Sequence, residues 1–177
     1  MKKGEIYEGV VERIDFPNKG RVHVEGETVT VKNAIPGQKI RFQINKKRKN
    51  RMEGRLLEVT EKSPMEKRDP VCSIFPSCGG CMYQTMSYED QLAMKAGQVN
   101  EAGEADYPFL GIKGSPKEFA YRNKMEFSFG DEYKDGPLSL GLHKKGSTYD
   151  VLTACDCKIV HEDFTKILTC VLAYFKE

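Results

Sequence analysis

The chain has 177 residues, of which 39% are hydrophobic and 31% are charged, which is enough apolar material to bury a core in one ordinary domain or two small ones. No apolar run approaches the roughly 20 residues that a membrane-spanning helix needs, and the Met-Lys-Lys start leads into a polar segment without an apolar signal core. These features exclude a membrane-spanning protein, and we expect a soluble, cytoplasmic one.

The formal net charge of +2 conceals an asymmetry along the chain. Residues 1–62 carry 15 Lys and Arg against 9 Asp and Glu, whereas residues 63–177 carry 13 against 17. The basic part contains the run Lys46-Lys47-Arg48-Lys49-Asn50-Arg51. Such a run is typical of a surface that binds nucleic-acid phosphates, although a solvated hairpin tip has the same composition.

Within residues 5–60, polar and apolar positions alternate in short stretches that predict strands at 6–14, 21–24, 28–31, 40–44 and 55–59. Turn signals separate them at Asn18-Lys-Gly20, Glu25-Gly26 and Ile35-Pro-Gly37. Five short strands predict a small closed barrel. In oligonucleotide-binding (OB) barrels, one strand face and the edge loops contact the nucleic acid. The candidate contacts here are Arg41, Lys46, Lys47, Arg48 and Arg51.

Cysteines dominate the segment that follows. Residues 63–70 hold two prolines and predict a linker, after which Cys72, Cys78 and Cys81 fall within ten residues, the last two around Gly79-Gly80. In a reducing compartment this crowding favours metal ligation over disulfides. A glycine loop that can fold around inorganic sulfide suits a four-iron cluster held by four thiolates. Zinc remains an alternative, as do incidental buried cysteines.

Downstream, Ser87 with Asp90 three residues later predicts the start of a short helix. Its expected apolar stripe consists of Leu92, Ala93, Ala96 and Val99. Residues 119–130 and 138–143 predict strands, and a second cysteine segment, Cys155-Asp-Cys157, lies beyond them. An amphipathic helix closes the chain, with its stripe at Phe164, Ile167, Leu168, Val171, Leu172 and Phe175. Cys170 lies off the centre of that stripe, and we interpret it as structural or incidental.

The cysteine loop carries a family resemblance. The pattern Cys72-x5-Cys78-Gly-Gly-Cys81, followed by Tyr83, Gln84, Ser87, Tyr88 and Gln91, resembles the iron-sulfur segment of bacterial 23S ribosomal-RNA uracil-C5 methyltransferases. In that family a TRAM domain, which is an OB-type barrel, comes first. The cluster cysteines follow, and then a central RNA-binding domain with a run similar to Tyr121-Arg122-Asn123-Lys124.

The resemblance implies a mainly β fold with short helices. The implied parts are a five-stranded OB-type (TRAM) barrel at 1–62, a linker, iron-sulfur loop and helix at 63–100, and a β-rich α+β domain at 101–177. It places the fourth cluster ligand at Cys157, with Cys155 as the competing residue. It also makes Tyr121, Arg122 and Lys124 candidate RNA contacts, although Arg122 and Lys124 could instead pair with acids such as Glu126 on an exposed strand face.

The implied function is that of an RNA-binding, [4Fe-4S]-carrying N-terminal portion of an RNA (uracil-5-)-methyltransferase acting on ribosomal RNA. S-adenosylmethionine binding and methyl transfer would need a C-terminal domain whose glycine-rich turn we do not find in this sequence, so no catalytic residue is assigned. The alternative is a free-standing, zinc-stabilised RNA-binding module. A radical adenosylmethionine enzyme would need a different cysteine spacing. We expect a monomer whose final helix is covered by a further domain or a partner.

Overall fold

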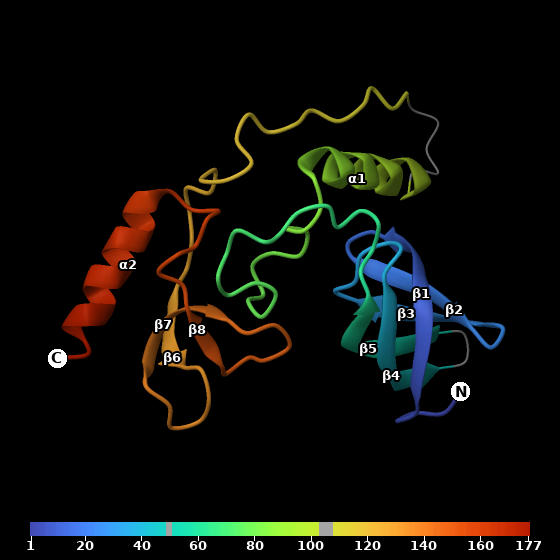
Figure 1. Cartoon of the computed structure of the whole chain (residues 1–177), viewed down its shortest axis with the longest axis horizontal. Helices are drawn as coiled ribbons and strands as arrows, with labels where there is room; N and C mark the ends of the chain where they lie inside the picture. The colour runs from blue at the N-terminus through green and yellow to red at the C-terminus, as the bar shows by residue number, and fades with distance from the viewer. Residues whose placement is uncertain (49–50, 103–107) are drawn as a thin grey trace. The chain divides into compact units, whose positions relative to one another are not determined.

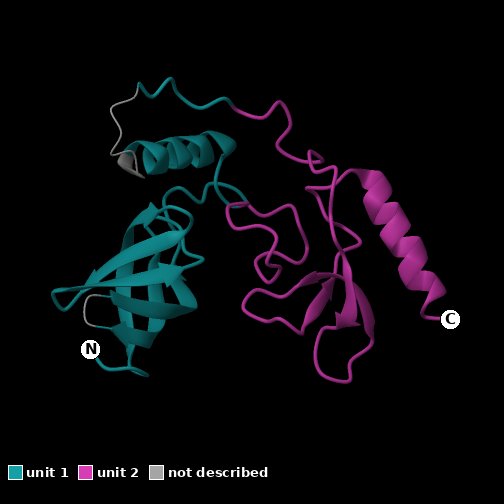
Figure 2. Ribbon diagram, turned by 180° about the vertical axis from the view of Figure 1, so that it is seen from behind, with its two compact units in different colours: residues 1–68, 85–113 teal, residues 69–84, 114–177 magenta. Residues whose placement is uncertain are grey.

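The computed structural model describes residues 1–48, 51–102 and 108–177 (Figure 1). The chain divides into two compact units, one formed by residues 1–68 and 85–113 and the other by residues 69–84 and 114–177 (Figure 2). Lys49 and Asn50 of the basic run lie outside the described residues. Among the described residues, no helix is both long enough and apolar enough to cross a membrane.

The first unit is built on the five-stranded barrel that the sequence predicts. Its strands are β1 (Ile6–Asp15), β2 (Lys19–Val24), β3 (Glu27–Lys32), β4 (Lys39–Arg48) and β5 (Arg51–Glu61). They close in the order β1-β2-β3-β5-β4, with β3 and β5 parallel and all other neighbours antiparallel. A small closed barrel of this kind is the OB type, and its interior is filled by side chains.

Alternation along the strands explains the barrel core. The inward side chains are fully or almost fully buried, and they include Val11, Val22, Val29, Val31, Ile40, Phe42 and Ile44. At the tip of the β2–β3 hairpin, Glu25 and Gly26 have φ angles of 53° and 78°, as a two-residue turn with positive φ at both central positions requires. Gly37 has a φ of 84°, and the Gln38 N–H donates to the Ile35 carbonyl at 3.2 Å, which closes the expected Pro-Gly turn.

Gly20 has a different role from the one expected. The turn after β1 falls at residues 16–18, and Gly20 lies within β2, where it pairs with Val31. A Cβ at this position would lie 2.7 Å from the Val31 carbonyl oxygen. Glycine is therefore needed here for close strand contact and not for a chain reversal.

The helix after the cysteine loop, α1 (Tyr88–Ala102), belongs to the barrel unit. As predicted, it begins next to Ser87, whose hydroxyl accepts a hydrogen bond from the Asp90 N–H at 3.1 Å. The expected stripe is correct only in part, because Leu92 and Ala96 are half-buried whereas Ala93 and Val99 are exposed. Met94 packs against the barrel core, and the buried Gln98 side chain donates to the Ile14 carbonyl at 3.0 Å.

The second unit combines a small sheet with the closing helix. Strands β6 (Ser128–Asp131), β7 (Leu138–His143) and β8 (Val151–Thr153) are antiparallel in the order β6-β7-β8. Helix α2 (Glu162–Tyr174) buries Leu168 and Leu172 in the same apolar cluster as Leu140 of β7. The predicted helix is thus confirmed, although Ile167 and Phe175 of its expected stripe are 63% and 59% exposed.

The strand expected at 119–130 is correct only at its end, where β6 begins at Ser128. Residues 119–127 form no ladder apart from one parallel bridge between Arg122 and Val160. Ala120 has a φ of 52°, a left-handed conformation that interrupts an extended strand. Two backbone N–H groups of this segment, those of Ala120 and Arg122, donate to the carbonyls of Lys158 and Ile159.

Candidate metal centre

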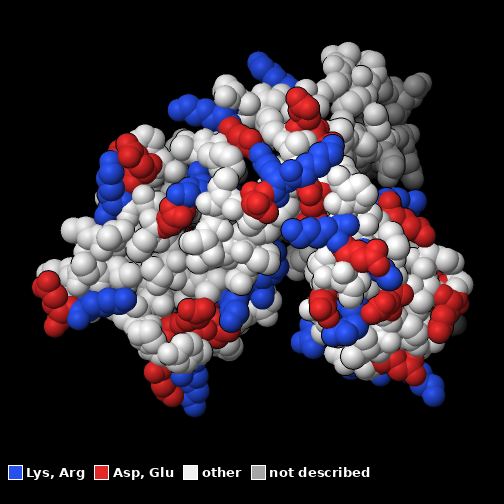
Figure 3. Space-filling view, in the orientation of Figure 1, with Lys and Arg blue, Asp and Glu red and all other residues white. Residues whose placement is uncertain are grey.

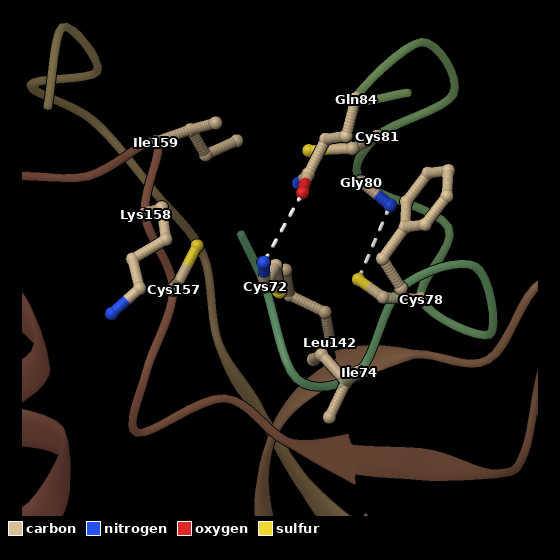
Figure 4. A pocket seen from close by; sticks show the side chains of 11 residues that line it. Cys72, Ile74, Cys78, Gly80, Cys81, Gln84, Leu142, Cys157, Lys158 and Ile159 are labelled. Atoms are coloured by element: carbon tan, nitrogen blue, oxygen red, sulfur yellow. Dashed lines mark hydrogen bonds between the residues drawn. The ribbon is translucent and has the colours of Figure 1, made fainter. Parts of the chain in front are cut away.

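Four thiols from two remote segments line one pocket in the second unit. Cys72, Cys78 and Cys81 come from the loop before α1, and Cys157 comes from the segment after β8. Figure 4 shows their sulfur atoms facing a shared space. Cys155 does not line this pocket and packs beside the Leu140 cluster. The structure therefore brings Cys157, and not its competitor, to the three loop cysteines.

Individual backbone hydrogen bonds, and not a regular strand or helix, hold the cysteine loop in its conformation. The Cys78 N–H donates to the Ile74 carbonyl at 3.0 Å, and the Gly79 N–H donates to the carbonyl of His143, at the end of β7, at 3.1 Å. A Cβ on Gly79 would lie 3.3 Å from that same carbonyl oxygen. The Gly80 N–H points at the Cys78 sulfur, 3.3 Å away. The two glycines thus let the loop lie close against β7 and turn an N–H toward a sulfur.

A second set of hydrogen bonds positions Cys157. Its own N–H donates to the Ala154 carbonyl at 3.2 Å. At the next two residues, the Ala120 N–H donates to the Lys158 carbonyl and the Arg122 N–H donates to the Ile159 carbonyl, both at 2.9 Å. The irregular segment at 119–122 therefore stabilises the position of the segment that carries Cys157.

The thiols affect one another electrostatically. Burial raises the pKa of Cys78, the Gly80 N–H lowers it, and the thiols of Cys81, Cys72 and Cys157 raise it further. Burial also raises the pKa of Cys81, where the Gln84 side chain acts in the opposite direction and Cys157 and Cys72 again raise it. Thiolates that share a desolvated space repel one another, and a bound cation or cluster relieves that repulsion.

The donor set fits a thiolate-bound metal group. Four cysteines are the ligand set of an iron-sulfur cluster, and zinc also accepts four thiolates. Apolar side chains complete the wall of the pocket, namely Ile74, Phe75, Leu142 and Ile159. In the part of the chain that the structure describes, no three His, Cys, Asp or Glu side chains are grouped closely enough to hold a single metal ion. The four thiols share a pocket and do not converge on one point.

The predicted RNA contacts of the barrel lie on the β4–β5 hairpin, and several are paired with acids. Arg41 forms an ion pair with Glu58 at 2.8 Å. Glu53 pairs with both Lys46 at 3.4 Å and Arg51 at 3.2 Å. The Lys47 ammonium donates to the Met1 carbonyl at 2.8 Å, and Arg48 is exposed at the end of β4. Figure 3 accordingly shows basic and acidic side chains interspersed on the visible face.

The predicted contacts of the second unit differ among themselves. Tyr121 is 54% exposed. Lys124 lies 3.8 Å from Glu126, with both side chains more than four-fifths exposed, so the expected alternative of pairing with Glu126 is present for this lysine. Arg122 is the smallest of the influences on Cys81, whose pKa it lowers. Its guanidinium is therefore within electrostatic reach of the thiol pocket as well as exposed to solvent.

Sequence reasoning missed the side chains that accompany the thiols. Leu142 and Phe75 line the pocket, and Lys145 lies over the Phe75 ring. Lys145 belongs to a Lys-Lys-Gly turn whose composition is that of a solvated loop. The hydrogen bonds between this turn and the cysteine loop place Lys145 next to the loop, and they join residues that are far apart in the sequence.

The comparisons with known proteins cover all or nearly all of the chain but only part of each relative. No protein-family model matches the chain. It is 45% identical to an uncharacterized RNA methyltransferase of Clostridium tetani and 44% identical to one of Caldanaerobacter subterraneus, with 100% of the chain and 40% of each relative covered. A relative from Bacillus cereus is 33% identical over 92% of the chain and 36% of its own length. The chain thus spans about 40% of the length of these curated relatives.

A solved structure shares the fold. The tRNA (uracil-54, C5)-methyltransferase of Pyrococcus abyssi, in complex with S-adenosyl-L-homocysteine, superposes with a TM-score of 0.64 at 18% sequence identity. The match covers 96% of this chain and 36% of that protein. Sequence and fold similarities therefore both extend over nearly the whole chain and over the smaller part of each relative.

Proposed function

We propose, from the premise that the chain matches the N-terminal part of RNA methyltransferases, that it is the substrate-binding portion of an RNA (uracil-5-)-methyltransferase acting on ribosomal RNA. In this proposal it carries a [4Fe-4S] cluster on Cys72, Cys78, Cys81 and Cys157. Binding of S-adenosylmethionine and methyl transfer to uridine C5 belong to the further part that the relatives contain. The protein would act in the cytoplasm as a monomer.

One observation carries the cluster proposal, namely that four thiols from two remote segments line a single pocket. When bound, the cluster supplies four iron–thiolate bonds that cross-link the cysteine loop to the segment after β8. Closing so long a loop by cross-linking restricts the unfolded chain. In this proposal the cluster has a structural role and holds the cysteine loop against the segment that carries Cys157.

Metal analysis tests this proposal directly. The chain is purified without oxygen, its visible spectrum is recorded, and iron, acid-labile sulfide and zinc are assayed. We expect a brown protein with matched iron and sulfide, which Cys157→Ser loses and Cys155→Ser keeps. The two serine variants are matched controls, because only one of these cysteines lines the pocket. Zinc without sulfide would overturn the cluster and favour the alternative of a zinc-stabilised RNA-binding module.

The barrel supports the RNA-binding part of the proposal. The five predicted contact residues lie on β4 or at the start of β5, on the type of barrel whose strand face and loops hold single-stranded nucleic acid. Each phosphate contact with single-stranded RNA contributes about 0.7 to the slope of log affinity against log salt. We expect Arg48→Gln to lower affinity for a ribosomal-RNA fragment and to reduce that slope by about this amount.

Lys176→Gln removes the same charge at the end of the chain and is the control for Arg48→Gln. If the two variants weakened RNA binding equally, net charge and not the barrel hairpin would account for the affinity.

In this proposal, methyl transfer requires the longer protein that the relatives represent. Joined to the part that the relatives carry beyond the matched region, the chain should support methylation of uridine C5 in ribosomal RNA, measured by transfer of a labelled methyl group.

A further inference from the structure

Lys145 occupies an unusual position for a lysine in a turn. It is half-buried, and its backbone N–H donates to the Ser77 carbonyl at 2.7 Å. Its ammonium lies 5.9 Å from the centre of the Phe75 ring, and Phe75 lines the thiol pocket. The lysine is thus attached at its backbone to the cysteine loop and held at its side chain against the pocket wall.

The turn that carries Lys145 is joined to the cysteine loop at three successive points. Besides the bond to Ser77, the Gly79 N–H donates to the His143 carbonyl at 3.1 Å, and Cys78 forms an antiparallel bridge with Lys144. These contacts hold the backbone of the turn against the loop. With the ammonium over the Phe75 ring, they place a positive charge beside the loop.

Burial of an ammonium is unfavourable unless negative charge lies nearby. Burial lowers the pKa of Lys145, and the thiols of Cys78 and Cys81 oppose that effect and raise it. The Phe75 ring that the ammonium lies over also lines the thiol pocket, so the positive charge of Lys145 lies at the wall of that pocket.

We propose that Lys145 is a positioning residue that holds a fixed positive charge against the thiolates of Cys78 and Cys81, so that a bound cluster is lost more slowly and reduced more easily. The inference rests on the proposed function, because it concerns the cluster that those thiolates would bind. An iron-sulfur cluster with four thiolates carries net negative charge, and its reduction potential depends on that charge and on nearby charges. One electron from dithionite adds a further negative charge, and no bond forms or breaks.

The test compares three variants of the whole chain after anaerobic reconstitution. Lys145→Met keeps the aliphatic stem and removes the charge, whereas Lys145→Arg keeps the charge. Lys144→Met is the matched control, because Lys144 is its half-buried neighbour on the same turn. The measurements are the rate of cluster loss to a chelator, followed by the decay of visible absorbance, and the midpoint potential in a dye-mediated dithionite titration.

We expect Lys145→Met to lose its cluster several-fold faster and to have a midpoint potential that is lower by about 59 mV, which corresponds to a tenfold change in the reduced-to-oxidised ratio. Lys145→Arg and Lys144→Met should behave like the unmodified chain. Two outcomes would overturn the inference and leave the proposed function intact. One is a Lys145→Met protein that contains its cluster and has an unchanged midpoint potential. The other is an equal rate of cluster loss in Lys145→Met and Lys145→Arg. An unmodified chain that binds no iron and sulfide would overturn both.

Discussion

Gly54→Ala tests how tightly the barrel core is packed. Gly54 lies on β5 between Ile44 of β4 and Val31 of β3. A Cβ at this position would lie 2.7 Å from Cδ2 of Phe42 and 3.1 Å from Cγ2 of Val31. Phe42 is fully buried, so its ring cannot move aside without displacing other core side chains.

The expected size of the effect combines two opposing contributions. Overpacking a well-filled core costs about 1–3 kcal/mol, whereas the lower flexibility of alanine in the unfolded chain returns about 0.4–1 kcal/mol. We therefore expect Gly54→Ala to lower the free energy of unfolding of the barrel by about 1–2 kcal/mol. Gly97→Ala is the control on α1, where the new Cβ meets nothing within 4 Å. It should instead stabilise the helix by up to about 1 kcal/mol.

Amide hydrogen exchange on the full chain measures this effect unit by unit. Peptides from β3, β4 and β5 should exchange about five- to thirtyfold faster in Gly54→Ala, since 1.4 kcal/mol corresponds to a factor of ten. Peptides from β7 provide an internal reference. Adding Phe42→Leu should make room for the new methyl group, so the double variant should be more stable than the sum of the two single changes predicts. Unchanged barrel protection, or strictly additive effects, would refute the packing argument.

Three further predictions concern charge and thiol chemistry. Burial raises the pKa of Asp15, but hydrogen bonds from two arginines, Arg21 foremost at 2.6 Å, bring it below the ordinary 3.8. Its stabilisation should therefore be complete above that value and disappear as the pH falls further, and acid titration of unfolding should show a weaker dependence in Asp15→Asn. Glu53→Gln frees two hairpin cations and should raise RNA affinity and steepen its salt dependence in a filter-binding assay; weaker binding would contradict the predicted RNA face. Because burial raises the pKa of Cys78 and Cys170 is exposed, iodoacetamide should alkylate Cys170 first and Cys78 last in the metal-free chain, as read by mass spectrometry, and the reverse order would contradict the observed burial.

Local sequence was sufficient for much of the barrel. Alternating apolar residues set which face of each strand is buried, and this alternation has the same period wherever the strand pairs. Glu25-Gly26 likewise predicted its own turn, because the backbone conformation of a two-residue hairpin depends on the two residues that form it. The crowded cysteines and their glycines also lie within ten residues, and their role as a ligand loop stays a prediction.

Only the tertiary structure decided the features that depend on distant partners. Cys155 and Cys157 differ little in local sequence. Cys157 lies in the pocket next to residues 158–159, whose carbonyls accept hydrogen bonds from the N–H groups of Ala120 and Arg122. The buried face of α1 was predicted only in part, because Leu92 and Ala96 are half-buried but the barrel also offers a buried carbonyl to the polar Gln98. A strand at 119–127 needed a neighbouring ladder that the fold does not supply. Side-chain periodicity determines local conformation, whereas pairing partners and site membership are set by contacts between residues far apart in the chain.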